Sequence, residues 1–284
     1  MKVFDDTNYQ ELLPQRRERC QNGAVVGVHH ANGADWYCSH VPTNTGRKMM
    51  AEAPNFGDVF PIFPRSEWSA RIKEQKERKR RISDYQKFKA HAQTGPTCWA
   101  NGPAHAFTTQ RVIQGLPLVY ISANSCAVPI SGGVSGGDEY DAGEMALNRG
   151  LAACDVWPNG SRNRSLNTDQ KCQESRKRYR ALQLYSLRGT EQFMTACLMD
   201  IPFCLAVAFN WWSHVISGAD PVEIEAGSFG WDWRNNWGDS WGEKNDYGFG
   251  GYVRMREGHG TPNSGFAFGP VLDAADQTVD NQGD

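Results

Sequence analysis

Apolar residues follow a helical pattern in the middle of the chain and gather into short strand-like runs further on. A helix is predicted from Cys98 to Gly115, whose glycine would end it, and a shorter amphipathic helix over 141–150. Residues 190–198 are expected to form a helix that packs on the apolar strand 203–209. Because the helices precede the strands, the pattern predicts an α+β fold with a helical lobe and a sheet lobe.

A possible hairpin precedes these elements. Val25–Val28 and Trp36–Tyr37 flank an Asn-Gly pair, which predicts two short strands joined by a turn. Four nearby side chains are of zinc-ligand type: Cys20, His29, His30 and Cys38. They have no Cys-x-x-Cys spacing, so an ordinary hairpin is favoured over a zinc site.

The composition is that of a soluble globular chain of 284 residues with a net charge of −2. Such a charge gives no general attraction to nucleic acid or to membranes, so neither is expected as a partner. No apolar run approaches the roughly 20 residues of a membrane span, and the start lacks the apolar core of a secretory signal. Eight cysteines are too few for a disulfide scaffold. We therefore expect a reducing location, in the cytoplasm or within a particle, with export by a route that the sequence does not reveal as the alternative.

The segment Gln93-Thr-Gly-Pro-Thr-Cys98-Trp99 contains the strongest candidate for chemistry. A cysteine at the start of a helix is favoured as a thiolate, because the unpaired N–H groups there stabilise negative charge. The backbone N–H of Cys98 and the side-chain amide of Gln93 could both donate to an oxyanion. A nucleophilic cysteine also needs a histidine base. His214, in the apolar strand-like run Ser213-His214-Val215-Ile216, is the candidate.

Further downstream the chain reads Asn235-Asn-Trp237-Gly-Asp-Ser-Trp241-Gly, followed by Gly251-Tyr-Val-Arg. Together with the Cys98 segment and the strand histidine, these motifs resemble the papain-like cysteine peptidases. The resemblance implies an α+β, two-lobe fold with the active site in the cleft between a helical lobe and an antiparallel sheet lobe. It also implies the following catalytic residues: Cys98 as nucleophile, His214 as base, Asn235 as its orienter and Gln93 as oxyanion donor.

The resemblance divides the chain into three parts. These are an N-terminal extension (1–60), a papain-like peptidase domain (61–272) and a polar C-terminal tail (273–284). Within the domain, the helical lobe is expected at about 90–155 and the sheet lobe at about 181–272. The tail has a composition that is usually disordered, and both polar ends are expected to contact neighbours in a large assembly.

The implied function is hydrolysis of peptide bonds in an extended peptide or protein, through a Cys98 thiolate and an acyl-enzyme thioester. Catalysis of this kind needs no metal or cofactor. Gly136 and Gly137 match the family's loop that pairs with the substrate backbone, and a flexible loop without that role is the alternative. Trp237, also assigned to the substrate site, is expected to cover the Asn235–His214 hydrogen bond from water.

Several positions depart from the family pattern. The Gln93–Cys98 spacing is one residue shorter than usual, which could move the amide away from the oxyanion. Gly102-Pro103 predicts either a later helix start or a kink. His105 would sit about 10 Å along the helix from Cys98, so we expect it to be packed or exposed instead of acting as the base.

The resemblance also matches Cys126 to Cys172 as a disulfide pair, which a reducing compartment would leave as two thiols. A second function stays open because the chain shows neither an export signal nor the family's propeptide pattern. It is that of a structural or assembly component with the papain fold, for example of a virus particle, with weak or no activity. A transferase or amidase that uses the thioester differently is a third hypothesis.

Overall fold

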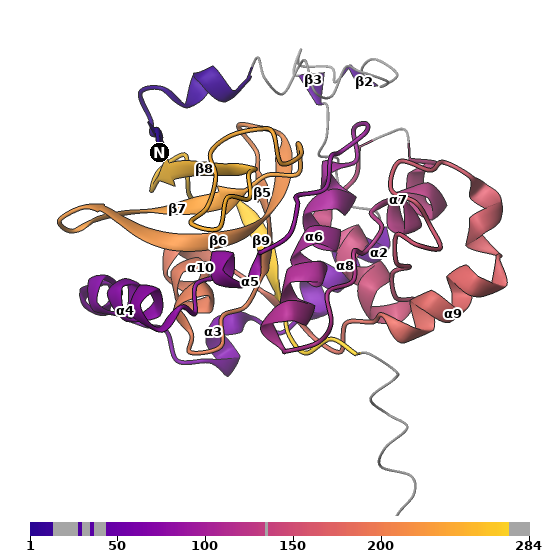
Figure 1. Ribbon diagram of the computed structural model, residues 1–284, viewed down its shortest axis with the longest axis horizontal. Helices are drawn as coiled ribbons and strands as arrows, with labels where there is room; N and C mark the ends of the chain where they lie inside the picture. Colours follow the sequence, from indigo (N-terminus) through magenta and orange to yellow (C-terminus); the bar gives the residue numbers. More distant parts are fainter. Residues whose placement is uncertain (14–27, 30–34, 37–43, 134–135, 273–284) are drawn as a thin grey trace, which may run out of the picture.

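The computed structural model describes residues 1–13, 28–29, 35–36, 44–133 and 136–272. Within these ranges the chain forms a sheet lobe and a helical lobe that meet along α6 (Cys98–Ile113) and β6 (His214–Glu225) (Figure 1). Helices and a mostly antiparallel sheet occupy separate lobes, so the predicted α+β, two-lobe fold is confirmed.

The sheet lobe is built on a seven-stranded sheet in the order β1-β8-β7-β6-β5-β9-β4. Neighbouring strands are antiparallel, except that β1 runs parallel to β8. The strands besides β6 are β1 (Val3–Phe4), β4 (Leu184–Ser186), β5 (Leu205–Phe209), β7 (Ser228–Arg234), β8 (Tyr252–Arg256) and β9 (Ser264–Phe268). Every residue of β5, the apolar run predicted as a strand, is buried. The continuous apolar sequence of β5 reflects a strand with no solvent-facing side.

The helices divide between the two lobes (Figure 1). Those of the helical lobe are α6, α7 (Asn124–Ser131), α8 (Glu139–Asn148), α9 (Gln170–Arg178) and the short η2 (Arg164–Asn167). Those that pack on the sheet lobe are α3 (Phe56–Val59), α4 (Arg65–Arg78), α5 (Ile82–Tyr85) and α10 (Gly189–Leu198). α4 is rich in charged residues, and its pairs Glu67–Arg71 and Glu74–Arg78 bridge successive turns.

α6 lies at the centre of the molecule, and all but one of its residues are buried. It begins at Cys98 and contains Pro103, so the later start considered from the sequence does not occur. Gly102 lets the helix approach the sheet closely, because a Cβ there would lie only 2.9 Å from Val215 Cγ1. Gly102 thus has a packing reason at the junction of the lobes.

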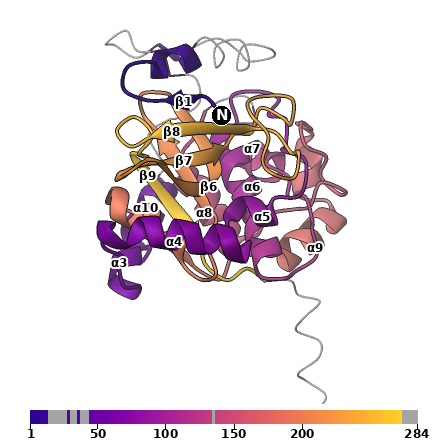
Figure 2. The same ribbon diagram turned by 60° about the vertical axis from the view of Figure 1, so that its left-hand side comes forward.

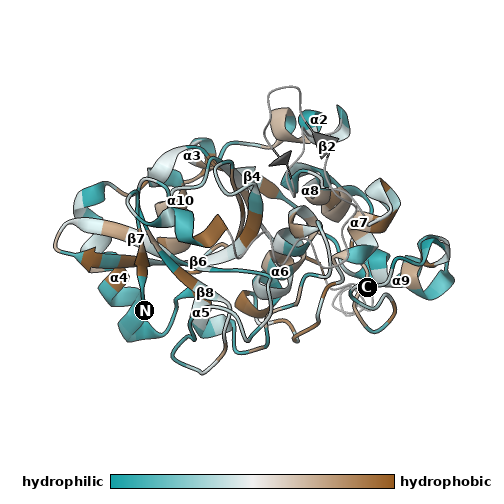
Figure 3. Ribbon diagram, turned by 90° about the horizontal axis from the view of Figure 1, so that it is seen from above, coloured by the Kyte–Doolittle hydropathy of each residue, from teal (hydrophilic) through white to brown (hydrophobic). Residues whose placement is uncertain are grey.

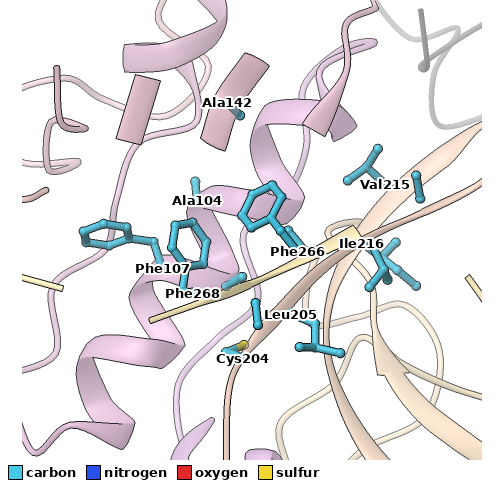
Figure 4. Close-up of a cluster of buried hydrophobic side chains, with 14 of the residues drawn as sticks. Ala104, Phe107, Ala142, Cys204, Leu205, Val215, Ile216, Phe266 and Phe268 are labelled. Carbon is cyan, nitrogen blue, oxygen red and sulfur yellow. The ribbon is translucent and has the colours of Figure 1, made fainter. Parts of the chain in front are cut away.

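Aromatic and aliphatic side chains fill the space between the lobes (Figure 4). Phe107 of α6 meets Phe268 of β9 edge to face, with ring centroids 5.4 Å apart. Phe266 contacts Phe268 in the same manner at 5.1 Å. Edge-to-face pairs stabilise a core beyond the area that they bury. This shared core fixes α6 relative to the strands.

Parts of residues 1–60, expected as an extension, pack on both lobes. β1 adds a strand at the edge beside β8 (Figure 2), while α2 (Asn44–Glu52) packs on α8. The predicted hairpin strands are present as β2 (Val28–His29) and β3 (Asp35–Trp36), which pair antiparallel. Three members of the candidate zinc set lie outside the described residues: Cys20, His30 and Cys38. The polar tail, residues 273–284, also lies outside them, so its prediction stays untested.

The outer helix α9 is mainly hydrophilic (Figure 3) and buries Cys172 and Arg176. Cys172 and Cys126 are both buried, and both are thiols and not partners in a disulfide. Within the described ranges, no helix combines the length and the apolar character needed to cross a membrane.

Candidate active site

Cys98 is the first residue of α6 and is fully buried. Thr97 precedes it as the N-cap, and its carbonyl accepts hydrogen bonds from the N–H groups of Ala100 and Asn101 at 3.1 and 2.9 Å. The thiol therefore lies at the positive end of a sixteen-residue helix, as the sequence predicted. Such a position favours negative charge on the sulfur.

His214 is the first residue of β6 and is also fully buried. Its Nε2 lies 2.8 Å from Asn235 Oδ1. That oxygen also accepts the backbone N–H of Asn236 at 2.7 Å, which identifies it as the carbonyl oxygen of the amide. Because a carbonyl oxygen can only accept, Nε2 must carry the proton in the neutral ring.

The other ring nitrogen of His214, Nδ1, is buried without a hydrogen-bond partner among the described residues. With the proton on Nε2, this atom presents a lone pair that can accept a proton. The Asn235 amide therefore sets the tautomer that a general base needs.

The direction of the contact between α6 and β6 indicates which ends of the two elements adjoin. Gly102 packs on Val215, and one turn further His105 Nδ1 lies 2.6 Å from Ser217 Oγ. The contact advances in the same direction along both chains. Cys98 lies four residues, about 6 Å along the helix, before Gly102, and His214 lies directly before Val215, so both residues lie in the direction of the same end of the contact. The sequence prediction that these two residues come from opposite lobes agrees with the fold.

Aromatic rings enclose the imidazole of His214. The Trp237 ring lies 4.8 Å from it and is tilted by 33°. The Trp212 ring also lies 4.8 Å away, edge-on at 65°. Both tryptophans are buried. They exclude water from the His214–Asn235 bond, which strengthens it. The prediction did not include Trp212, although a tryptophan two residues before the candidate base was a usable signal.

Gln93 reaches the site through its backbone. Its N–H donates to the Asn236 carbonyl at 2.8 Å, and the preceding Ala92 pairs with Trp237. Its side-chain amide, however, donates to the carbonyl of Gly95. The same carbonyl accepts the N–H of Thr97 at 2.8 Å, so the shortened loop folds back on itself. Gln93 is therefore beside the site, with its amide engaged by the loop before Cys98.

Gly137 lies against Trp99, the residue that follows Cys98. A Cβ on Gly137 would come within 2.4 Å of the indole ring, so no side chain fits there. Gly136 is partly exposed, and the two preceding residues lie outside the described ranges. The ring of Trp99 is a sufficient reason for glycine at position 137. Binding of substrate by either glycine stays a prediction.

Two adjacent carboxyl groups next to this loop, the half-buried Asp138 and the buried Glu139, were missed by the sequence reasoning. Burial and the neighbouring Glu139 raise the pKa of Asp138 to about 8, and burial also raises the pKa of Glu139. Ser264 Oγ donates to Glu139 at 2.5 Å. Adjacent acidic residues at a helix start resemble ordinary capping residues in sequence, so only the fold distinguishes them.

His105 is fully buried and packed, as expected. Burial, with the nearby charge of Arg234, holds its pKa well below the usual range. It is therefore neutral, and it lies two turns from Cys98. Among the described residues, no group of three or more His, Cys, Asp or Glu side chains is arranged to hold a metal ion.

No protein-family model matches the chain, and no curated protein matches it significantly. Several solved structures, however, match the chain. Procathepsin L2 from the larval midgut of Tenebrio molitor aligns over 92% of this chain and 90% of that one, with 16% identity and a TM-score of 0.56. Procathepsin B S9 from Trypanosoma congolense aligns over 92% and 98%, with 17% identity and a TM-score of 0.52. A structure from work on the mite allergens Blo t 1 and Der p 1 aligns over 91% and 90%, with 18% identity and a TM-score of 0.54.

The chain has the papain-like fold. At this identity the likeness concerns the fold alone, and it agrees with the family resemblance of the motifs. Cys98 opens α6 at the junction of the lobes, and His214 of β6 contacts Asn235 within the sheet lobe.

Proposed function

We propose that this chain is a cysteine peptidase that hydrolyses peptide bonds through the Cys98 thiolate and an acyl-enzyme thioester. The observation that carries the proposal is the state of His214. Its Nε2 is fixed by Asn235 Oδ1 at 2.8 Å, and its Nδ1 has no partner among the residues described. A buried imidazole held in one tautomer, at the end of β6 that adjoins the start of α6, suits a general base.

In the proposed mechanism, His214 Nδ1 takes the proton of the Cys98 thiol. The thiolate attacks the carbonyl carbon of the scissile amide, and the carbonyl oxygen becomes an oxyanion. The imidazolium then gives its proton to the leaving amine, and the C–N bond breaks to leave a thioester. Water, deprotonated by His214, attacks the thioester, and the acid product leaves as the thiol is restored.

The Cys98 backbone N–H is the first proposed donor to the oxyanion. Gln93 is the second, and its amide would have to turn from the Gly95 carbonyl to reach the substrate. We assign extended peptides as the substrate class, with Gly136 and Gly137 as the backbone-binding loop. Trp237 contributes by covering the His214–Asn235 bond.

The alternative from the sequence, a structural or assembly component of a particle, has no support among the similar structures, which include a procathepsin B, a procathepsin L2 proteinase and a mite allergen. A structural component predicts a Cys98 thiol of ordinary reactivity, whereas a peptidase predicts an activated one. Measuring the reactivity of Cys98 therefore distinguishes the two functions.

An epoxide-type thiol inhibitor tests the proposal, with the labelled cysteine identified by mass spectrometry. We expect fast labelling of Cys98 in the parent and little in His214→Ala. Cleavage of a casein substrate should disappear in Cys98→Ala. Slow labelling spread over several cysteines, unchanged in His214→Ala, would contradict a peptidase and favour the structural role.

A further inference from the structure

The segment of residues 1–13, called the β1 arm below, makes contacts that lead to His214. It is held to the sheet lobe by β1, whose Val3 pairs with Arg254 of β8, and by the fully buried Leu12 (Figure 2). It also includes a short helix, η1 (Tyr9–Glu11). The proposed mechanism gives the β1 arm no role.

Asp6 and Tyr9 of the β1 arm both contact His259, which lies in the connection between β8 and β9. Asp6 Oδ1 accepts the backbone N–H of His259 at 2.9 Å and lies 2.6 Å from its Nδ1. The Tyr9 ring stacks on the imidazole, with centroids 3.6 Å apart. Gly258 makes room for this contact, since a Cβ there would lie 2.6 Å from Asp6 Oδ1. His259 is therefore held to the β1 arm by three separate contacts.

From His259 the contacts continue to the turn that precedes the proposed base. Trp211 Nε1 donates to the His259 carbonyl at 2.8 Å, and the Tyr9 ring meets Trp211 edge-on at 4.9 Å. Trp211 stacks on Trp212 with ring planes within 6°. Trp212 in turn lies edge-on to His214 at 4.8 Å. An unbroken series of packed rings thus joins the β1 arm to the imidazole.

The turn itself needs such support. Ser213, directly before His214, has a φ of +48°, in the left-handed region that residues other than glycine seldom adopt. A conformation of this kind persists only where the surrounding contacts hold it. On one side Asn263 Oδ1 accepts the N–H of Asn210 at 2.7 Å. On the other side the turn is held through Trp211 by His259 and Tyr9.

We propose that the β1 arm is a positioning element for His214, acting through His259, Trp211 and Trp212, and that it is part of the working site and not a dispensable extension. This inference rests on the proposed function only for its effect on the reaction rate. Its structural content, that the β1 arm sets the orientation of the imidazole, can be measured separately.

The test compares Tyr9→Ala, Tyr9→Phe and the control Tyr247→Ala. Tyr247 is a half-buried tyrosine of the same lobe whose hydroxyl donates to Asp84 and whose ring is contacted by Lys87. We expect Tyr9→Ala to lower kcat about 10-fold with KM changed less than about 2-fold, because a displaced base slows chemistry more than binding. Tyr9→Phe keeps the stacked ring and should restore kcat, and Tyr247→Ala should leave it unchanged.

The His214 imidazole signal in NMR of histidine-labelled protein gives a readout that does not require activity. Ring currents from Trp212 and Trp237 make its shift sensitive to orientation, so it should move in Tyr9→Ala and stay fixed in Tyr247→Ala. If Tyr9→Ala does not fold, Asp6→Asn provides the same comparison with a smaller change.

Three results would overturn the proposal: an unmoved His214 signal, parental kcat in Tyr9→Ala, or a raised kcat, which would make the β1 arm inhibitory. A parent without peptidase activity would refute the proposed function alone, since the NMR signal would still decide the role of the β1 arm.

Discussion

His214 and His105 lie in the same contact between α6 and β6, yet their surroundings give them different capacities. Both are fully buried, and each has one ring nitrogen bonded and the other without a partner among the described residues. His214 is bonded by an amide oxygen, which can only accept and so fixes the tautomer. His105 is bonded by the Ser217 hydroxyl, which can donate or accept.

Position separates them further. His214 lies at the end of the contact where Cys98 opens the helix, whereas His105 lies two turns away, near the guanidinium of Arg234. Burial alone therefore does not distinguish the proposed base. The proposal for His214 rests on its bond to the Asn235 amide and on its place at the end of β6 that adjoins the start of α6.

The largest expected effect is on the rate of peptide cleavage when each histidine is replaced. We predict that His214→Ala lowers kcat/KM by about 10²- to 10⁴-fold, the usual contribution of a general base. His105→Gln should change it by less than about 3-fold, because His105 does not reach the thiol. Steady-state kinetics on one peptide substrate measure both. If kcat/KM falls equally in His214→Ala and His105→Gln, the two histidines do not differ in the way proposed.

Replacing the orienting amide should have the next largest effect. Asn235→Ala removes the acceptor for His214 Nε2 and frees the ring to turn, so kcat is expected to fall roughly 10- to 100-fold. Ser217→Ala removes the corresponding partner of His105 and serves as the matched control. If Ser217→Ala lowers kcat as much, the Asn235 bond has no special role in orientation.

The contact shared by both histidines can be disturbed at Gly102. A Cβ there would press on Val215 Cγ1 at 2.9 Å and on the Ile216 backbone oxygen at 3.1 Å. Gly102→Ala is expected to destabilise the fold by about 1–3 kcal/mol, the usual cost of overpacking. Urea unfolding measures this change. If Gly102→Ala is as stable as the parent, close packing is not the reason for Gly102.

The smallest expected effect concerns acid stability. Burial, with Arg234 nearby, lowers the pKa of His91 to about 4, and the His105 ring also lies 6.2 Å away. The unfolded chain binds this proton near pH 6.5, so it binds more protons than the folded chain between about pH 4 and 6.5. Stability from neutral His91 is therefore present above about pH 6.5 and is lost as the pH falls towards 4. Thermal melts should show that His91→Gln loses less stability than the parent between about pH 6.5 and 4. If the melting temperature falls with pH equally steeply in both proteins, His91 is not the source of this pH dependence.

The sequence predicted the residues whose types are dictated by chemistry. A thiol before a helix, a histidine opening an apolar strand and an amide before tryptophan-glycine each have a local signal. The two-lobe fold follows from the order of helices and strands. The site had to be assembled from residues more than a hundred positions apart, which the family resemblance supplied.

The sequence did not predict features that depend on contacts made only in the fold. Trp212 and the β1 arm act through ring packing across three separate segments. The Gln93 amide bonds to Gly95 because the loop before Cys98 folds back, and no local pattern specifies that turn. Gly137 is explained by Trp99, although glycine alone indicated a substrate loop. Each of these features is a contact between segments that are distant in the sequence, so no local pattern predicts it.

The central claim is that Cys98 and His214 share a proton, and the pH dependence of Cys98 alkylation by iodoacetamide tests it most directly. An isolated thiol reacts as it ionises near pH 8.5. We predict that Cys98 of the parent still reacts rapidly at pH 6 and that His214→Ala returns it to the ordinary profile, while His105→Gln does not. A parent whose Cys98 reacts only near pH 8.5, with a profile unaltered in His214→Ala, would contradict the claim.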